Sequence, residues 1–167
     1  RRGTTLQRQW KTAEPTTQMT TAAAPVRATT TTNVRTEAIT SITGTIGYMN
    51  TFLGNIASYV NVDGSSRAES SYTFTPTASS QSAADLNTLN GNATNISLAN
   101  VNTISSSSLT DLGTLATAIG NTEFTNAAGL TTINVSDNPV DVTSLIARID
   151  SFDSINGGST TAMTLVS

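Results

Sequence analysis

Carboxylates are the groups in this sequence whose spacing could support chemistry, and they form two close pairs. Asp150 lies three positions before Asp153, and Asp137 lies four positions before Asp141. Paired carboxylates can hydrolyse glycosides, and oxygen-rich loops can bind calcium. Neither pair lies in a known motif, and the spacing of an EF-hand loop is absent. We therefore expect these aspartates to cap helices or face solvent, with a weak calcium site at Asp137, Asn138 and Asp141 as the alternative.

The sequence contains no cysteine and no histidine. This excludes thiol nucleophiles, disulfides, most zinc sites and histidine acid–base catalysis. It also lacks a P-loop, a nucleophile elbow and a dinucleotide fingerprint. We therefore predict a protein that is not an enzyme and uses no cofactor. An enzyme acting on surface polysaccharides is kept as an alternative class, because a substrate pocket need not leave a motif.

The composition suits a protein that works in an assembly. Charged residues make up 11% and aromatic residues 5%, and threonine, serine, asparagine and alanine fill the difference. A core built from such small side chains leaves a lone monomer marginal, so association or a repetitive architecture would stabilise it. The sequence contains no apolar run long enough to cross a membrane.

The net charge of −3 divides unevenly along the chain. Residues 1–35 carry six basic residues and one acid (+5), whereas residues 36–167 carry two basic residues and ten acids (−8). Residues 12–33 are rich in threonine and alanine and cannot order themselves by burial. We therefore predict an extended basic arm over residues 1–35 that docks on a neighbouring subunit; nucleic acid is the less favoured partner, because aromatic stacking platforms are absent. The residues expected to anchor this arm are Arg2, Leu6, Arg8, Trp10 and Met19.

An apolar heptad pattern follows the arm. Its steps alternate between three and four residues over 36–62, which is typical of a helix with one apolar seam. Isoleucine at both core positions favours trimers or tetramers over dimers, and we expect a trimer, although three glycines lower the helix propensity. Three interpretations stay open: a helix in the core of its own domain, an intersubunit bundle, or a strand or irregular path. The seam consists of Ile39, Ile42, Ile46, Met49, Leu53, Ile56 and Val60.

A degenerate repeat begins after a linker or strand at residues 63–82. A phrase of the form x-Asp-(Leu/Val)-x-(Thr/Ser)-Leu occurs at 84–89, 110–115 and 140–145. Each copy follows an extended run, at 71–75, 96–104 and 130–135, and this order predicts a short β/α stack over residues 83–167. One stretch, 130–140, matches a leucine-rich-repeat strand and turn, but a single copy does not predict a full horseshoe.

The expected helices of this stack span about 84–90, 109–119 and 139–152. Ser108 or Asn138 could act as an N-cap, and Pro139 suits the first helical position. In the last helix, the spacing of Val142, Leu145, Ile146 and Ile149 predicts one buried face.

Two resemblances bear on function. Residues 84–89 and 132–137 resemble repeats of very large cyanobacterial surface and haemolysin-like proteins, and of virion proteins of phages that infect such cells. The opening Arg1-Arg2-Gly3-Thr4-Thr5 resembles the start of many phage tail-fibre and tropism-determinant proteins. That second match ends after a few residues and transfers no binding residue. Both resemblances imply a structural protein displayed outside the cell.

These observations lead to one hypothesis for the whole chain. We expect an α+β fold with an extended arm, one amphipathic helix that could form a trimeric coiled coil, and a β/α repeat-like body. We expect a non-enzymatic virion subunit, as a fibre, decoration or adaptor protein, with a pilus, sheath, S-layer or adhesin subunit at the cell surface as the alternative. The expected partners are copies of the chain, other structural proteins of the assembly and a host-surface receptor, with no membrane.

Overall fold

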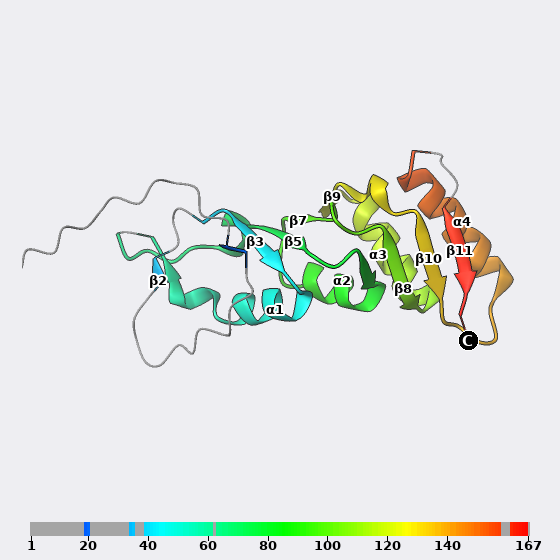
Figure 1. Cartoon of the computed structure of the whole chain (residues 1–167), viewed down its shortest axis with the longest axis horizontal. Coiled ribbons are helices and arrows are strands. Elements are labelled where there is room, and N and C mark those ends of the chain that lie inside the picture. Colours follow the sequence, from blue (N-terminus) through cyan, green and yellow to red (C-terminus); the bar gives the residue numbers. More distant parts are fainter. Residues whose placement is uncertain (1–18, 21–33, 36–38, 62, 158–160, 167) are drawn as a thin grey trace, which may run out of the picture.

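A computed structural model describes residues 19–20, 34–35, 39–61, 63–157 and 161–166. These residues form an elongated molecule in which the chain advances along the long axis, from β2 (Val34–Arg35) and α1 (Ile46–Gly54) at one end to α4 (Val142–Ile155) and β11 (Ala162–Leu165) at the other (Figure 1). The chain therefore builds its core in successive layers.

The strands form parallel sheets. The first sheet has the order β1-β3-β5-β7-β9, the second has the order β6-β8-β10-β11, and β2 pairs with β4. Every pairing between these strands is parallel. In the first sheet and the β2–β4 pair, the strands are β1 (Met19–Thr20), β2 (Val34–Arg35), β3 (Ser41–Gly44), β4 (Tyr59–Val60), β5 (Thr73–Pro76), β7 (Ile96–Ser97) and β9 (Phe124–Thr125). In the second sheet they are β6 (Ser80–Ser82), β8 (Thr103–Ser107), β10 (Thr132–Val135) and β11 (Ala162–Leu165).

Four α-helices lie in the described part of the chain: α1 (Ile46–Gly54), α2 (Ala83–Asn90), α3 (Leu109–Gly120) and α4 (Val142–Ile155). From β5 onward the chain repeats one unit, which we call a coil. Each coil consists of a strand of the first sheet, a strand of the second sheet and a helix, in that order. The fold is therefore mixed α/β, with strands and helices that alternate along the chain. The predicted combination of helices and strands is confirmed. The predicted β/α stack is confirmed, and it already begins with β3 and α1, ahead of residue 83.

Apolar side chains in register hold neighbouring coils together. In the first sheet, Ile42 pairs with Phe74, Phe74 with Ile96, and Ile96 with Phe124. All four are buried. In the second sheet the buried Ile104 pairs with Ile133. Burying an isoleucine or phenylalanine side chain contributes about 1.5–3 kcal/mol, so these ladders stabilise the stack despite the small average side chain.

Polar caps fix where the helices begin. Ser82 and Ser108 are the N-caps of α2 and α3, and their side-chain oxygens accept hydrogen bonds from the N–H groups of Asp85 and Asp111. The prediction of Ser108 as a cap is therefore confirmed. Helix α4 begins later than predicted, because Asp141 accepts from Thr143 N–H and acts as its N-cap. Asn138 is not a cap, and the third copy of the repeated phrase is displaced relative to its helix.

The predicted heptad helix over residues 36–62 is wrong in its extent. Ile42 lies on β3 and Val60 on β4, while α1 covers only Ile46–Gly54. The segment before α1 is rich in isoleucine and threonine, which favour strands. Thr45 then caps the helix by accepting from the N–H of Tyr48. The apolar spacing therefore belongs to a strand that is followed by a short helix.

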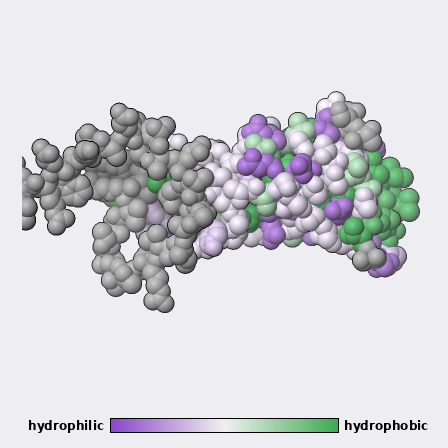
Figure 2. All heavy atoms as spheres, in the orientation of Figure 1, coloured by the Kyte–Doolittle hydropathy of each residue, from purple (hydrophilic) through white to green (hydrophobic). Residues whose placement is uncertain are grey.

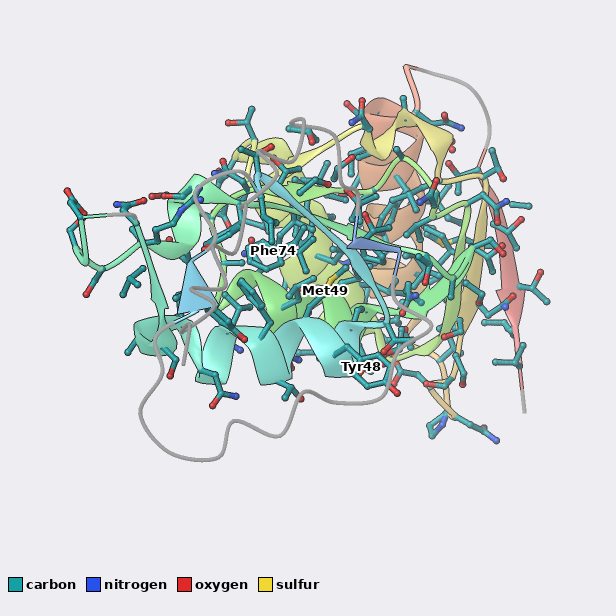
Figure 3. All side chains as sticks on the ribbon, turned by 60° about the vertical axis from the view of Figure 1, so that its left-hand side comes forward. Tyr48, Met49 and Phe74 are labelled. Carbon is teal, nitrogen blue, oxygen red and sulfur yellow. The ribbon has the colours of Figure 1, made fainter. Side chains whose placement is uncertain are left out.

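The apolar face of α1 belongs to the core of this chain. Ile46, Met49 and Leu53 are its buried residues. Figure 3 shows Met49 and Phe74 in the space between α1 and the strands, whereas Tyr48 projects from the outer side of the helix. Of the three interpretations of this segment, packing within its own domain describes the structure.

Polar contacts also connect one coil to the next. Asn87 Nδ2 of α2 donates to the Asp111 carbonyl of α3 at 3.0 Å. The Ala83 N–H, at the start of α2, donates to Ser107 Oγ of the following coil at 2.9 Å. The Leu109 N–H, at the start of α3, donates to Asp137 Oδ2 of the coil after that at 2.6 Å. The first amides of α2 and α3 therefore each donate to a side-chain oxygen of a residue in the following coil.

Candidate functional site

Three of the four closely spaced aspartates, Asp137, Asp141 and Asp153, serve structural roles. Asp137 accepts from the first amide of α3, and Asp141 caps α4. Asp153 Oδ1 accepts from the Thr161 N–H at 2.6 Å and so ties α4 to the start of β11. The expectation that these aspartates cap helices is confirmed for Asp137 and Asp141. Within the described ranges, no group of three or more acidic, histidine or cysteine side chains converges as a metal site.

The cap of α4 changes the acidity of its carboxylate. The Ser144 hydroxyl donates to Asp141 Oδ2 at 2.6 Å and the Thr143 N–H donates to Oδ1 at 3.0 Å. These hydrogen bonds favour the ionised form and lower the pKa of Asp141 below its ordinary value of 3.8. Asp141 is therefore a charged cap, suited to the positive end of a helix dipole.

A polar groove of ≈ 610 Å³ runs along α3 and is the candidate binding site. We call it the α3 groove. Helices α3 and α4 supply most of its wall, and its charged groups are Glu123 and Arg148. The lining residues are Asn90, Leu109, Thr110, Gly113, Thr114, Thr117, Ala118, Asn121, Glu123, Ser144 and Arg148.

Arg148 of α4 lies against the backbone of α3 at Gly113. A Cβ atom at position 113 would stand 2.9 Å from Arg148 Cζ. Glycine inside a helix costs about 0.5–1 kcal/mol relative to alanine, so the close approach gives a physical reason for Gly113. Arg148 Nε is buried and has no hydrogen-bond partner among the described residues. Arg148 thus places its guanidinium group in the wall of the α3 groove, with its Nε atom enclosed by protein.

Glu123 is already engaged at the other charged position. Its Oε2 accepts from Asn90 Nδ2, and its Oε1 accepts from Asn121 Nδ2. The charged side chains that line the α3 groove are therefore one guanidinium group, of Arg148, and one hydrogen-bonded carboxylate, of Glu123.

The predicted assembly arm lies largely outside the described residues. These undescribed residues include four of its five predicted anchors: Arg2, Leu6, Arg8 and Trp10. The backbone of Met19 is described, and it pairs in parallel with Ile42 of β3 in the same chain. Val34 likewise pairs with Tyr59. At these two places the arm segment contributes strands to the chain's own sheets.

The predicted oligomer seam does not form an exposed stripe. Ile42, Ile46, Met49, Leu53 and Val60 are buried in the chain's own core. Ile39 and Ile56 are partly buried and pack against it. A trimer stays a prediction, but the residues on which it rested have another role.

The structure also brings out residues that the sequence pattern did not single out. Gly113 lies inside a helix, and Arg148 interrupts an apolar face. These two features of the sequence could have indicated the contact between them. The predicted buried face of α4 is only partly right. Val142 and Ile146 are exposed, and Phe152 is the buried residue of that helix.

Comparisons with protein-family models, with curated proteins and with solved structures found no match. No helix in the described ranges combines the length and the apolar character that a membrane crossing requires.

Proposed function

We propose that this chain is a non-enzymatic structural subunit of an extracellular assembly, most specifically of a virion, as a fibre, decoration or adaptor protein. The observation that carries the proposal is the stack of coils with parallel sheets from β3 to β11. Stacked repeats contact only their neighbours and build extended, modular surfaces, which suits structural and binding proteins.

The side chains support a mechanical role. In the coils, serine, threonine and asparagine bond to neighbouring coils, as Asn95 Nδ2 does to the Ser70 carbonyl at 2.8 Å and Asn100 Nδ2 to the Pro76 carbonyl at 3.2 Å. Several acids cap helices or bridge coils, as Glu69 does by accepting from Thr94 at 3.1 Å. These groups stabilise the stack and present a polar surface with few charges.

A cell-surface subunit is the second candidate, as a pilus, sheath, S-layer or adhesin component. The resemblance to repeats of large surface proteins covers residues that lie within the stack, and it favours this candidate as much as the first. Both share the same mechanism: the basic arm docks on a neighbouring structural protein and the stack projects outward, where a host-surface receptor could bind.

Localisation tests the proposal directly. Quantitative mass spectrometry should detect the protein in purified virions at a stoichiometry comparable to other structural proteins, with little in washed cells. Enrichment in a cell-surface fraction instead would support the second candidate. Recovery only in the cytosolic fraction would contradict both.

Docking through the arm has its own test. We expect the double substitution Arg2→Glu and Arg8→Glu to reduce incorporation into the assembly, because it reverses part of the arm's +5 charge. The matched double substitution to lysine should incorporate normally. Equal incorporation of both variants would contradict docking by charge.

A further inference from the structure

The α3 groove is built by three successive coils. Asn90 comes from the end of α2, Ser144 and Arg148 come from the first half of α4, and α3 supplies most of the remaining wall. All the lining residues lie between Asn90 and Arg148 in the sequence, so the groove does not depend on what adjoins the last strand. Its volume of ≈ 610 Å³ lies in the range of small-molecule sites, roughly 300–1,000 Å³.

The hydroxyl groups of this wall present acceptors. In α3, Thr114 Oγ1 and Thr117 Oγ1 donate to backbone carbonyls one turn earlier in the helix, at 3.3 and 2.9 Å. In α4, Ser144 Oγ donates to Asp141 Oδ2 at 2.6 Å. A hydroxyl group has one proton and two lone pairs. Because each proton is already donated within the protein, a ligand in the groove meets these three oxygens as acceptors.

The charged groups divide between accepting and donating. Glu123 lines the groove with a carboxylate, which only accepts hydrogen bonds, and the amides of Asn90 and Asn121 hold it in place. Arg148 only donates. Its Nε is enclosed by protein, so its terminal nitrogens are the ones that a ligand can reach. Acceptors therefore outnumber donors among these side chains.

This pattern selects one class of ligand. A phosphate or sulfate accepts hydrogen bonds and would meet acceptor oxygens and the charge of Glu123. A cation would meet the guanidinium group of Arg148. A neutral, hydroxyl-rich molecule donates to the threonine, serine and glutamate oxygens and accepts from Arg148. Leu109 and Ala118 add apolar side chains to the lining, which suit the C–H groups of a sugar ring.

The surface of the stack agrees with a neutral partner. The face seen in Figure 2 is largely pale between its ends, which marks residues of intermediate hydropathy, and strongly hydrophilic residues are scattered over it. Charged residues make up 11% of the sequence. Such a surface gives little electrostatic steering toward a charged ligand.

We propose that the α3 groove binds a neutral oligosaccharide, as part of a surface glycan. The oxygens of Thr114, Thr117 and Glu123 accept from sugar hydroxyl groups, and Arg148 donates to one of them. This inference names the chemistry of the host-surface receptor and rests on the structural role proposed above.

Binding to printed glycans tests the ligand class. The full chain, labelled with a fluorophore, is applied to an array of neutral oligosaccharides together with sulfated and phosphorylated ones. We expect binding to members of the neutral set, with little change when the salt concentration is raised, because no exposed charge pair dominates the contact. Absence of binding to the array, or binding confined to anionic glycans and lost at high salt, would overturn the proposal.

Valine substitutions test the site. Thr114→Val together with Thr117→Val keeps the shape of the wall and removes two acceptor oxygens. The dissociation constant for the most strongly bound neutral glycan should rise about tenfold. Thr88→Val is the matched control: the Thr88 hydroxyl donates to the Ala84 carbonyl at 2.9 Å in the same way, but on α2 and outside the groove. Equal affinities of the double variant and the control would show that the glycan binds elsewhere.

Nuclear magnetic resonance locates the contact without any substitution. When the isotope-labelled parent chain is titrated with the same glycan, the amide signals of Thr114, Thr117 and Asn121 should shift and that of Thr88 should not. Shifts confined to other parts of the chain would contradict the proposal. Because these experiments use the isolated chain, a protein that binds no glycan but is found in purified virions would refute the glycan site and leave the structural role standing.

Discussion

At the scale of single residues, the contact between Arg148 and Gly113 is the least expected feature. It places a guanidinium group, with its Nε unpartnered among the described residues, over a glycine inside α3. The helix gives up propensity at Gly113, and the stem of Arg148 covers apolar surface between two helices. The contact should therefore couple the two positions energetically.

A double-mutant cycle measures this coupling. With Arg148→Ala in place, Gly113→Ala should raise the free energy of unfolding by about 0.5–1 kcal/mol, the ordinary propensity gain. In the parent chain the gain should be smaller, because the new Cβ must displace the guanidinium group, which lies 2.9 Å from it. Urea denaturation of the four proteins gives both values.

Gly120 provides the control for this cycle. It ends the same helix, and a Cβ there would meet nothing within 4 Å. The effect of Gly120→Ala should therefore be the same with and without Arg148. If Gly113→Ala also behaved identically in both backgrounds, the contact between Gly113 and Arg148 would be energetically irrelevant.

The lowered pKa of Asp141 predicts how stability responds to acid. Because its pKa in the folded chain lies below the unfolded value of 3.8, its contribution is fully present above that value. It is lost as the pH falls through the lower, folded pKa. Asp141→Asn keeps a capping oxygen without the charge. The parent should be more stable than this variant at neutral pH, and the difference should shrink in strong acid; a gap independent of pH would contradict the charged cap.

At the scale of elements, α1 separates two interpretations of one apolar pattern. Ile46 is 6% exposed and Tyr48 is 55% exposed, although they are two positions apart on the same helix. Ile46→Asp buries a charge without a partner and should cost more than about 3 kcal/mol of unfolding free energy. Tyr48→Asp should change it by no more than about 0.5 kcal/mol. Similar small effects of both, with loss of an oligomer for Ile46→Asp, would restore the intersubunit seam.

The elements were predictable where local signals agreed with packing. The repeated phrase and Ser108 located α2 and α3 to within a residue or so at each end. The pattern failed at residues 39–60, because steps of three and four fit a heptad helix and also fit a strand that leads into a short helix. Only the pairing of β3 with β5, a contact between distant residues, decides between them.

The candidate site was less predictable than the fold. The aspartate caps follow from local spacing, so they could be inferred. The approach of Arg148 to Gly113 and the exposure of Ile146 depend on which coil lies next to which, and no single segment encodes that. The periodicity of α4 correctly marked apolar positions but could not show that part of them face outward.

At the scale of the whole molecule, strand β11 lies at one edge of the second sheet, and hydrogen exchange should report its two sides amide by amide. The amides of Ala162 and Val166 donate to the carbonyls of Thr131 and Val135. Because strand groups alternate, the amides of Met163 and Leu165 point away from β10. We therefore expect Met163 and Leu165 to exchange faster than Ala162 and Val166. Equal exchange rates would contradict the parallel pairing of β10 with β11.

Small-angle X-ray scattering of the isolated chain tests the stacked architecture most directly, and the proposed structural role rests on that architecture. The distribution of interatomic distances should be asymmetric with a long tail, because the coils follow one another along one axis (Figure 1). A symmetric distribution, as a compact sphere gives, would contradict the stack and with it the account of this chain as a structural subunit.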